Sequence, residues 1–269
     1  MKVQKPYRYF GSKGRFYSEI KEIFIQSKKN TYIDLFAGGM EVAVNLKEDF
    51  KNIKVIANVK DEHIESFLKC NKIAINRYKE FARFLYKDIE KVSVKDLYVD
   101  KKLWTEVKRK YKKFRKENIL NFTDDEIKVV ELFASLNNGA SLSNSFYSSA
   151  KIEKMKIYQA KLKNIEITHK YFNENWSYRD SFILLDPPYL CGTEVVKNSK
   201  KGYNYSNIWT EKDDARLVKF IKNNLKNNNV FMVFGSLENN LSKLIQTDLQ
   251  LLRLPNVQLL ELSLAIQLI

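Results

Sequence analysis

Short strand-like and helix-like segments alternate along the first 60 residues, and this alternation constrains the fold more than any other feature. Strand-like runs at Thr31–Phe36 and Lys54–Ala57 alternate with helix-like stretches near residues 15–26 and 40–47. The pattern resumes later in the chain with predicted strands at Asn164–Ile167, Phe182–Leu185 and Val230–Phe234 and an amphipathic helix at Lys212–Leu225. Strands that alternate with helices pair in parallel. The sequence therefore predicts an α/β fold with a doubly wound sheet.

A strongly charged region interrupts this pattern. From about Asp61 to Val130 the sequence is helical in character and contains no convincing strand, and the polar stretch Asn137–Tyr147 is typical of a loop. Within the helical part, Lys101–Asn118 holds nine Lys or Arg residues and two Glu residues, interleaved with Trp104, Tyr111 and Phe114. Such a segment is either a solvated helix face or a surface that follows the phosphates of a nucleic acid.

Composition narrows the class of partner and the compartment. The 47 Lys and Arg residues exceed the 32 Asp and Glu residues by 15, which suits a polyanion such as nucleic acid, although a generally basic proteome gives the same excess. Cys70 and Cys191 are too few and too far apart for a disulfide framework or a zinc site. Neither a signal peptide nor an apolar run of about 18 residues is evident. We expect a cytoplasmic protein without a membrane segment or a metal.

The segment Asp186-Pro187-Pro188-Tyr189 follows the apolar strand Phe182–Leu185. Proline cannot donate to a sheet ladder, so the pair ends the strand and exposes its carbonyl groups. The ends of such strands are where active sites form in α/β sheets. A strand-terminating turn with an incidental acid is the alternative, but this tetrapeptide is expected by chance only roughly once in a thousand chains of this length.

Two further segments fit a nucleoside cofactor. Asp34–Met40 reads Asp-Leu-Phe-Ala-Gly-Gly-Met and lies between a strand and a helix, where glycines let a cofactor approach the backbone. It lacks the Lys and Ser/Thr ending of a P-loop, which disfavours ATP. Tyr9–Lys13 reads Tyr-Phe-Gly-Ser-Lys. In isolation each segment is also compatible with an ordinary turn.

In this order and spacing, the three segments resemble the Dam-type family of DNA adenine-N6 methyltransferases, over residues 7 to about 240. The resemblance implies a Rossmann-like methyltransferase sheet, with a catalytic domain at residues 1–60 and 160–269 and a helical and loop-rich insertion at 61–159 that recognises DNA. It also implies S-adenosyl-L-methionine as the cofactor, contacted by Tyr9 and Lys13 in a pocket shaped by Phe36, Gly38 and Gly39. Asp186, Pro187, Pro188 and Tyr189 would form the catalytic segment that holds the target base, with Asp186 also beside the cofactor.

Amino methylation needs these residue types. The lone pair of an adenine amino group is delocalised into the ring, so the nitrogen is a poor nucleophile. Asp186 can accept one N6 hydrogen and the Pro187 carbonyl the other, which localises the lone pair for attack. Tyr189 offers an aromatic face to a base flipped out of the helix. The cofactor supplies the electrophile, and no metal is required.

The chain departs from the family pattern at two places. Val59 stands where the family has an acid that hydrogen-bonds the cofactor ribose. Loss of this carboxylate contact is expected to weaken cofactor binding by roughly 1–3 kcal/mol. Asp61 either substitutes for the missing acid or is the acid at the start of a helix. The last 21 residues, Leu249–Ile269, hold nine Leu and two charged residues. They form either a terminal buried hairpin or helix, or an altered tail.

These observations lead to one principal hypothesis and two alternatives. The principal hypothesis is a monomeric DNA adenine-N6 methyltransferase of a restriction-modification system or phage-like element, acting on a short duplex site, with GATC the first to test. In it, Lys108, Arg109, Lys110, Lys112, Lys113 and Arg115 neutralise phosphates, and the 137–147 loop approaches base edges. The alternatives are an amino-methyltransferase acting on RNA or protein, and a catalytically silent DNA-binding relative.

Overall fold

The chain divides into two compact units. The computed structural model describes residues 2–7, 12–70, 72–85, 101–134, 149–187, 209–235 and 257–261. One unit consists of Lys13–Val59 and Asn164–Ile269, and we call it the sheet unit. The other consists of Met1–Ser12 and Lys60–Lys163, and we call it the helical unit. The first twelve residues thus group with the helical unit and not with the sheet that follows them.

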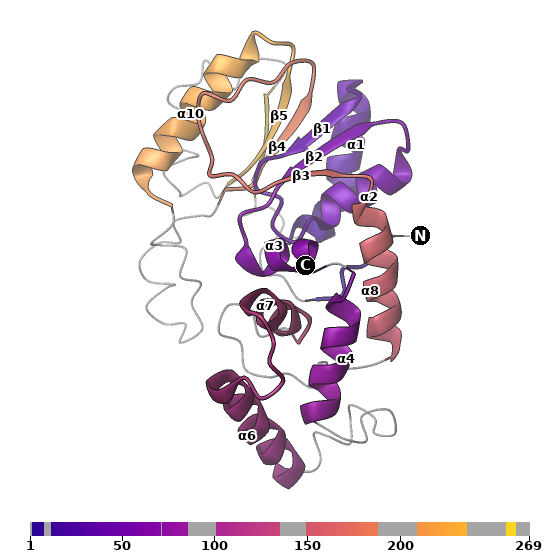
Figure 1. Ribbon diagram of the computed structural model, residues 1–269. Helices are drawn as coiled ribbons and strands as arrows, with labels where there is room; N and C mark the ends of the chain where they lie inside the picture. The colour runs from indigo at the N-terminus through magenta and orange to yellow at the C-terminus, as the bar shows by residue number, and fades with distance from the viewer. Residues whose placement is uncertain are drawn as a thin grey trace. The chain divides into compact units, whose positions relative to one another are not determined.

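The sheet unit contains a six-stranded sheet in the order β3-β2-β1-β4-β5-β6, in which every neighbouring pair is parallel (Figure 1). The strands are β1 (Thr31–Asp34), β2 (Lys54–Asn58), β3 (Glu166–Thr168), β4 (Phe182–Leu185), β5 (Val230–Gly235) and β6 (Val257–Glu261). The helices are η1 (Lys13–Phe16), α1 (Tyr17–Ser27), α2 (Glu41–Asp49) and α10 (Glu211–Leu225). The predicted α/β fold is confirmed. Of the leucine-rich tail, only β6 lies within the described residues, and it is a strand parallel to β5.

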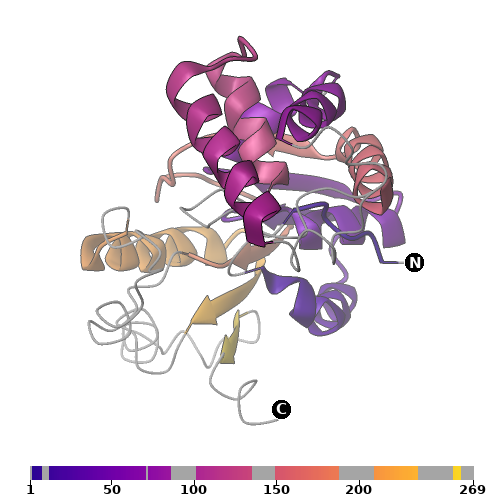
Figure 2. The same ribbon diagram turned by 90° about the horizontal axis from the view of Figure 1, so that it is seen from below.

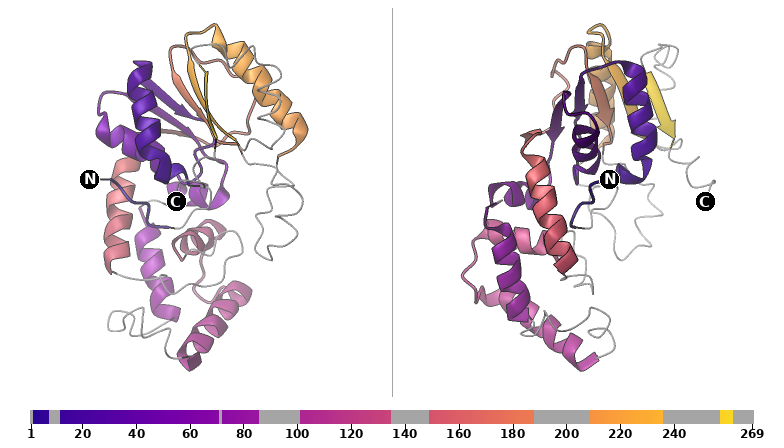
Figure 3. Two further views of the ribbon diagram at one scale, coloured as in Figure 1. Left: turned by 180° about the vertical axis from the view of Figure 1, so that it is seen from behind. Right: turned by 90° about the vertical axis from the view of Figure 1, so that its right-hand side faces the viewer.

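Alternate residues of the central strands bury both faces of the sheet. Ile33, Ile183 and Val233 belong to one apolar cluster with residues of α10. On the opposite face, the Phe182 ring packs against Phe24 of α1, with 5.7 Å between ring centroids. Figure 3 shows the sheet with α1 and α10 on opposite sides. Burial on both faces explains why the strands read as continuous apolar runs in the sequence.

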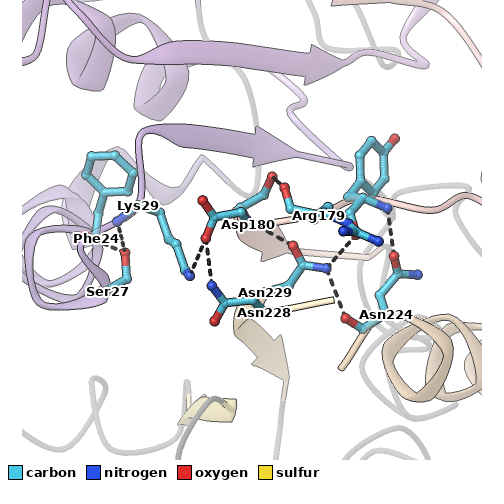
Figure 4. A network of polar contacts seen from close by, with 10 residues as sticks. Phe24, Ser27, Lys29, Arg179, Asp180, Asn224, Asn228 and Asn229 are labelled. Carbon is cyan, nitrogen blue, oxygen red and sulfur yellow. Dashed lines mark hydrogen bonds and ion pairs between the residues drawn. The ribbon is translucent and has the colours of Figure 1, made fainter. Parts of the chain in front are cut away.

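An amide network ties β4 to β5 at their amino ends (Figure 4). The buried Asn229 side chain donates to the carbonyl oxygens of Tyr178 and Asn224, at 2.8 and 2.9 Å, and accepts from the Ser181 N–H at 3.0 Å. Beside it, Lys29 pairs with Asp180 at 2.7 Å. Because these residues precede the strands, the network stabilises the end of the sheet where the strands begin, away from their carboxyl ends.

Replacing Asn229 by alanine is expected to lower the free energy of unfolding of the sheet unit by about 2 kcal/mol. The change removes three hydrogen bonds and leaves buried backbone groups without partners. Urea unfolding followed by tryptophan fluorescence measures the effect, since Trp209 belongs to this unit's core and Trp176 packs against it. Asn227→Ala is the control, because its side chain makes one exposed 3.3 Å contact with Ser177; a loss as large as that of Asn229→Ala would contradict the assignment.

The helical unit packs around aromatic side chains. Its helices are α3 (Glu62–Lys69), α4 (Ala74–Leu85), α6 (Lys101–Glu117), α7 (Asp124–Phe133) and α8 (Ser149–Leu162). Phe133 of α7 contacts the rings of Phe67, Tyr78 and Tyr7, with centroids 5.0, 5.7 and 6.1 Å away. Since Tyr7 takes part in this core, the N-terminal segment is fixed to the helical unit. Throughout the described residues, no helix is long and apolar enough to span a membrane.

A buried acid joins three of these helices. Glu131 of α7 accepts a hydrogen bond from the Tyr111 hydroxyl of α6 at 3.1 Å and pairs with Arg115 of α6 at 3.0 Å. Its other carboxylate oxygen lies 3.6 Å from Nε2 of His63 in α3. Burial lowers the pKa of His63, but Asp61 and Glu131 outweigh it and raise that pKa to about 9. The inner side of α6 is therefore held by charge pairing as well as by packing.

Candidate active site

The sheet has a topological switch point between β1 and β4. From β1 the chain proceeds outward to β2 and β3, and then returns to the other side of β1 to form β4. Asp34 at the end of β1 is in register with Leu184 of β4, and the Leu35 N–H donates to the Leu184 carbonyl at 3.2 Å. Beyond this contact the two segments diverge. The segment after β1 leads to Gly38 and Gly39, and the segment after β4 leads to Asp186. Crevices at such points bind ligands in open α/β sheets.

Lys13 and Asp186 meet at this point, although 173 positions separate them in the sequence. The Lys13 ammonium of η1 pairs directly with the Asp186 carboxylate, and both side chains are largely buried, with 8% and 14% exposed. The same ammonium lies 5.2 Å from the ring centroid of Phe234, near the end of β5. The pair thus joins the N-terminal part of the sheet unit to the carboxyl ends of β4 and β5.

The turn after β1 has a backbone that suits its glycines. Gly38 has φ of 45°, a left-handed conformation that glycine adopts without a steric cost, and Met40 follows with φ of 55°. The Ala37 N–H donates to the Asn58 carbonyl at 3.0 Å, which fixes the turn to the end of β2. The half-buried Phe36 ring packs against Phe172 and Trp209, at 5.6 and 5.3 Å between centroids. The turn therefore combines an open backbone with an aromatic wall.

Asp34 is a buried carboxyl beside the Lys13–Asp186 pair. Its two oxygens accept hydrogen bonds from the Phe36 N–H at 3.3 Å and the Tyr32 hydroxyl at 3.4 Å. Burial and the negative charge of Asp186 raise the pKa of Asp34 to about 7, even though these hydrogen bonds and Lys13 act in the opposite direction. Near neutral pH the site therefore holds a carboxyl that is only partly ionised.

The end of β2 carries an amide that satisfies several backbone groups. The Asn58 side chain donates to the carbonyls of Leu35 and Lys170, at 3.2 and 3.0 Å, and accepts from the Thr168 hydroxyl at 2.9 Å. Val59, the next residue, is fully buried and offers no side-chain acceptor. Asp61 caps α3 by accepting from the backbone N–H groups of His63 and Ile64. Asp61 is thus the acid at the start of a helix.

Six of the nine predicted site residues lie within the described parts of the chain. Lys13, Phe36, Gly38, Gly39, Asp186 and Pro187 all belong to the sheet unit, in η1 and after the ends of β1 and β4. Tyr9, Pro188 and Tyr189 lie outside the described residues, as does the 137–147 loop. Sequence reasoning did not assign a role to Asp34 or Asn58, which end the observed strands β1 and β2. Among the described residues, no group of three or more His, Cys, Asp or Glu side chains is arranged to hold a metal.

Comparisons with known proteins identify the family of this chain. The chain is 25% identical over 242 residues to the modification methylase StsI of Streptococcus sanguinis, a match that covers 81% of this chain and 33% of that protein. The chain thus corresponds to about a third of the length of this relative. A family model described as D12 class N6 adenine-specific DNA methyltransferase matches residues 9–258. Because that match covers most of the chain, the chain belongs to the D12 class of N6 adenine-specific DNA methyltransferases.

Proposed function

We propose that this chain transfers a methyl group from S-adenosyl-L-methionine to the N6 amino group of adenine in duplex DNA. The observation that carries the proposal is Asp186, held by Lys13 at the carboxyl end of β4, next to the glycine turn that follows β1. Asp186 accepts a hydrogen bond from one N6 hydrogen, and the Pro187 carbonyl accepts one from the other. These two hydrogen bonds localise the lone pair on the nitrogen. As the N6 nitrogen takes the methyl group, the methyl C–S bond would break and leave a neutral thioether, and the nitrogen would lose one proton through Asp186 to water.

The residues of the sheet unit fit the proposed cofactor. Gly38 keeps the turn open for a close backbone approach, and Phe36 supplies a half-buried aromatic surface. The Lys13 ammonium offers a cationic donor for a carboxylate. When bound, S-adenosyl-L-methionine supplies the methyl group as an electrophile on its sulfonium. Together with Tyr9, Gly39 and Asp186, these residues form the cofactor site that we propose.

Ribose recognition is the weak part of this site. Val59 cannot accept a hydrogen bond from a ribose hydroxyl, and Asp61 is engaged as a helix cap. We therefore expect cofactor binding to be weaker by about one to two decades than in a relative with a carboxylate at the position of Val59.

We infer that the helical unit recognises the DNA target and that the protein serves a restriction-modification system. The inference on the system rests on the name of the StsI relative, a modification methylase. The target sequence is tested with a panel of short duplexes, beginning with GATC. Tyr189 is assigned to stack on the flipped adenine.

Transfer of labelled methyl from S-adenosyl-L-methionine to unmethylated duplex DNA, followed by nucleoside analysis, tests the proposal. N6-methyladenine as the labelled product would support it. Label in RNA or protein, with none in DNA, would favour an amino-methyltransferase for another substrate. A folded chain that binds DNA but neither binds S-adenosyl-L-methionine nor makes product would be a catalytically silent relative. Because Val59 removes a cofactor contact, this silent relative is the second candidate function.

A further inference from the structure

The basic helix α6 has two faces with different tasks. Val107 and Phe114 are buried, and the Phe114 ring lies 4.9 Å from that of Phe81 in α4. Tyr111 and Arg115 reach Glu131 of α7. At 100° per residue, these positions turn the inner side of α6 toward α4 and α7. In Figures 1 and 2 the other described helices of this unit lie on one side of α6, and Arg109, Lys112 and Lys116 on its opposite side are exposed.

The cations of α6 differ in whether they are paired with an acid of the same unit. Three of the six residues expected to neutralise phosphate already have acidic partners within the unit: Lys110 with Glu106 at 3.3 Å, Lys113 with Glu117 at 3.7 Å, and Arg115 with Glu131 at 3.0 Å. By contrast, Arg109, Lys112 and Lys116 are exposed, and no acidic group among the described residues pairs with them. A charge without an internal partner is available to an external anion.

These three residues form one stripe. Their spacing of three and four places them within about 60° of each other around the helix, opposite Val107 and Phe114. The stripe extends about 10 Å along the axis, which corresponds to roughly three phosphates of one DNA strand. We infer that Arg109, Lys112 and Lys116, here called the outer stripe, contact the DNA backbone and set affinity without reading sequence. The inference rests on the proposed function for its choice of duplex DNA.

A matched pair of double variants on the same helix tests this inference. Lys112→Gln with Lys116→Gln removes two charges of the outer stripe, and Lys110→Gln with Lys113→Gln removes two charges that are already paired. Both variants change the net charge by the same amount, so the general field of the protein falls equally. Binding of the full chain to a fluorescent duplex is measured from about 50 to 200 mM salt, and thermal melting verifies that each variant is folded.

The outer-stripe variant is expected to reduce the slope of log affinity against log salt by about 1.8, or about 0.9 for each phosphate that is no longer neutralised. Adding Arg109→Gln is expected to bring the reduction to about 2.7, equally for every duplex sequence. The paired-lysine variant should change the slope by less than about half a unit. Equal effects of the two double variants, or a parent that does not bind duplex DNA, would overturn the inference. Binding is measured without added cofactor, so the two proposals can fail separately. Methylation that persists with an unchanged salt slope rejects the outer stripe alone, and DNA binding without methylation rejects the proposed function alone.

Discussion

Replacing Asp186 by alanine is expected to reduce methyl transfer by about 10³-fold or more, the largest effect on activity that we predict. The carboxylate is the acceptor that holds the N6 amino group, and water in its place cannot fix the geometry of attack. Methyl incorporation into duplex DNA at saturating cofactor measures the change. A variant that keeps a tenth of the parent's rate while correctly folded would remove Asp186 from the catalytic role.

The same substitution also disturbs folding, because Asp186 neutralises Lys13. With side chains only 8% and 14% exposed, loss of the acid removes the carboxylate that pairs with a buried ammonium, at a cost of about 3 kcal/mol. A second variant, Asp186→Ala with Lys13→Met, removes both charges and should regain most of this stability. It should nevertheless stay inactive. Recovery of activity together with stability would mean that Asp186 acts only by supporting the fold.

The elements of the sheet were predictable because their signals are local. Each central strand is buried on both faces and therefore appears as an unbroken apolar run, as Phe182–Leu185 does. Glycines and prolines mark the strand ends, and the alternation with helices requires parallel pairing. The observed bounds of β4 are those predicted, and those of β1 and β5 differ only at their carboxyl ends.

The pairings within the site were not predictable in this way. Lys13 was expected to contact the cofactor, and nothing in the neighbouring sequence indicates that its ammonium also pairs with Asp186, 173 positions away. Likewise, the role of Asn58 depends on Lys170 and Thr168, which β3 brings alongside β2. Long-range hydrogen bonds leave no periodic signal, so only the tertiary structure reveals them.

The same reason limits what a charge run can reveal. The sequence of α6 shows many cations but not which of them are paired, since Glu131 lies on a different helix. The family resemblance located Asp186 and the glycine turn through their motifs. It gave no information about Asp34, because a carboxyl that ends a strand looks the same whether it is ionised or buried and neutral.

Asp34→Asn is expected to raise the free energy of unfolding of the sheet unit by about 2–4 kcal/mol at pH 8. The folded pKa of Asp34 is raised to about 7, so between about pH 4 and 7 the folded chain binds more protons than the unfolded chain. Its contribution to stability is therefore present at low pH and is lost as the pH rises through 7. Asparagine keeps the acceptor for the Phe36 N–H and removes the charge that burial and Asp186 oppose.

Urea unfolding at pH 5 and pH 8, followed through Trp176 and Trp209, measures this difference. The parent should lose stability between the two values, and Asp34→Asn should lose less by the stated amount. Asp49→Asn is the opposite control: burial raises the pKa of Asp49, but hydrogen bonds from Lys21 and Tyr17 lower it overall, so its removal should weaken the fold at pH 8. If Asp34→Asn also weakens the fold at pH 8, Asp34 is ionised in a site that stabilises its charge, and Lys13 is then shared between two carboxylates.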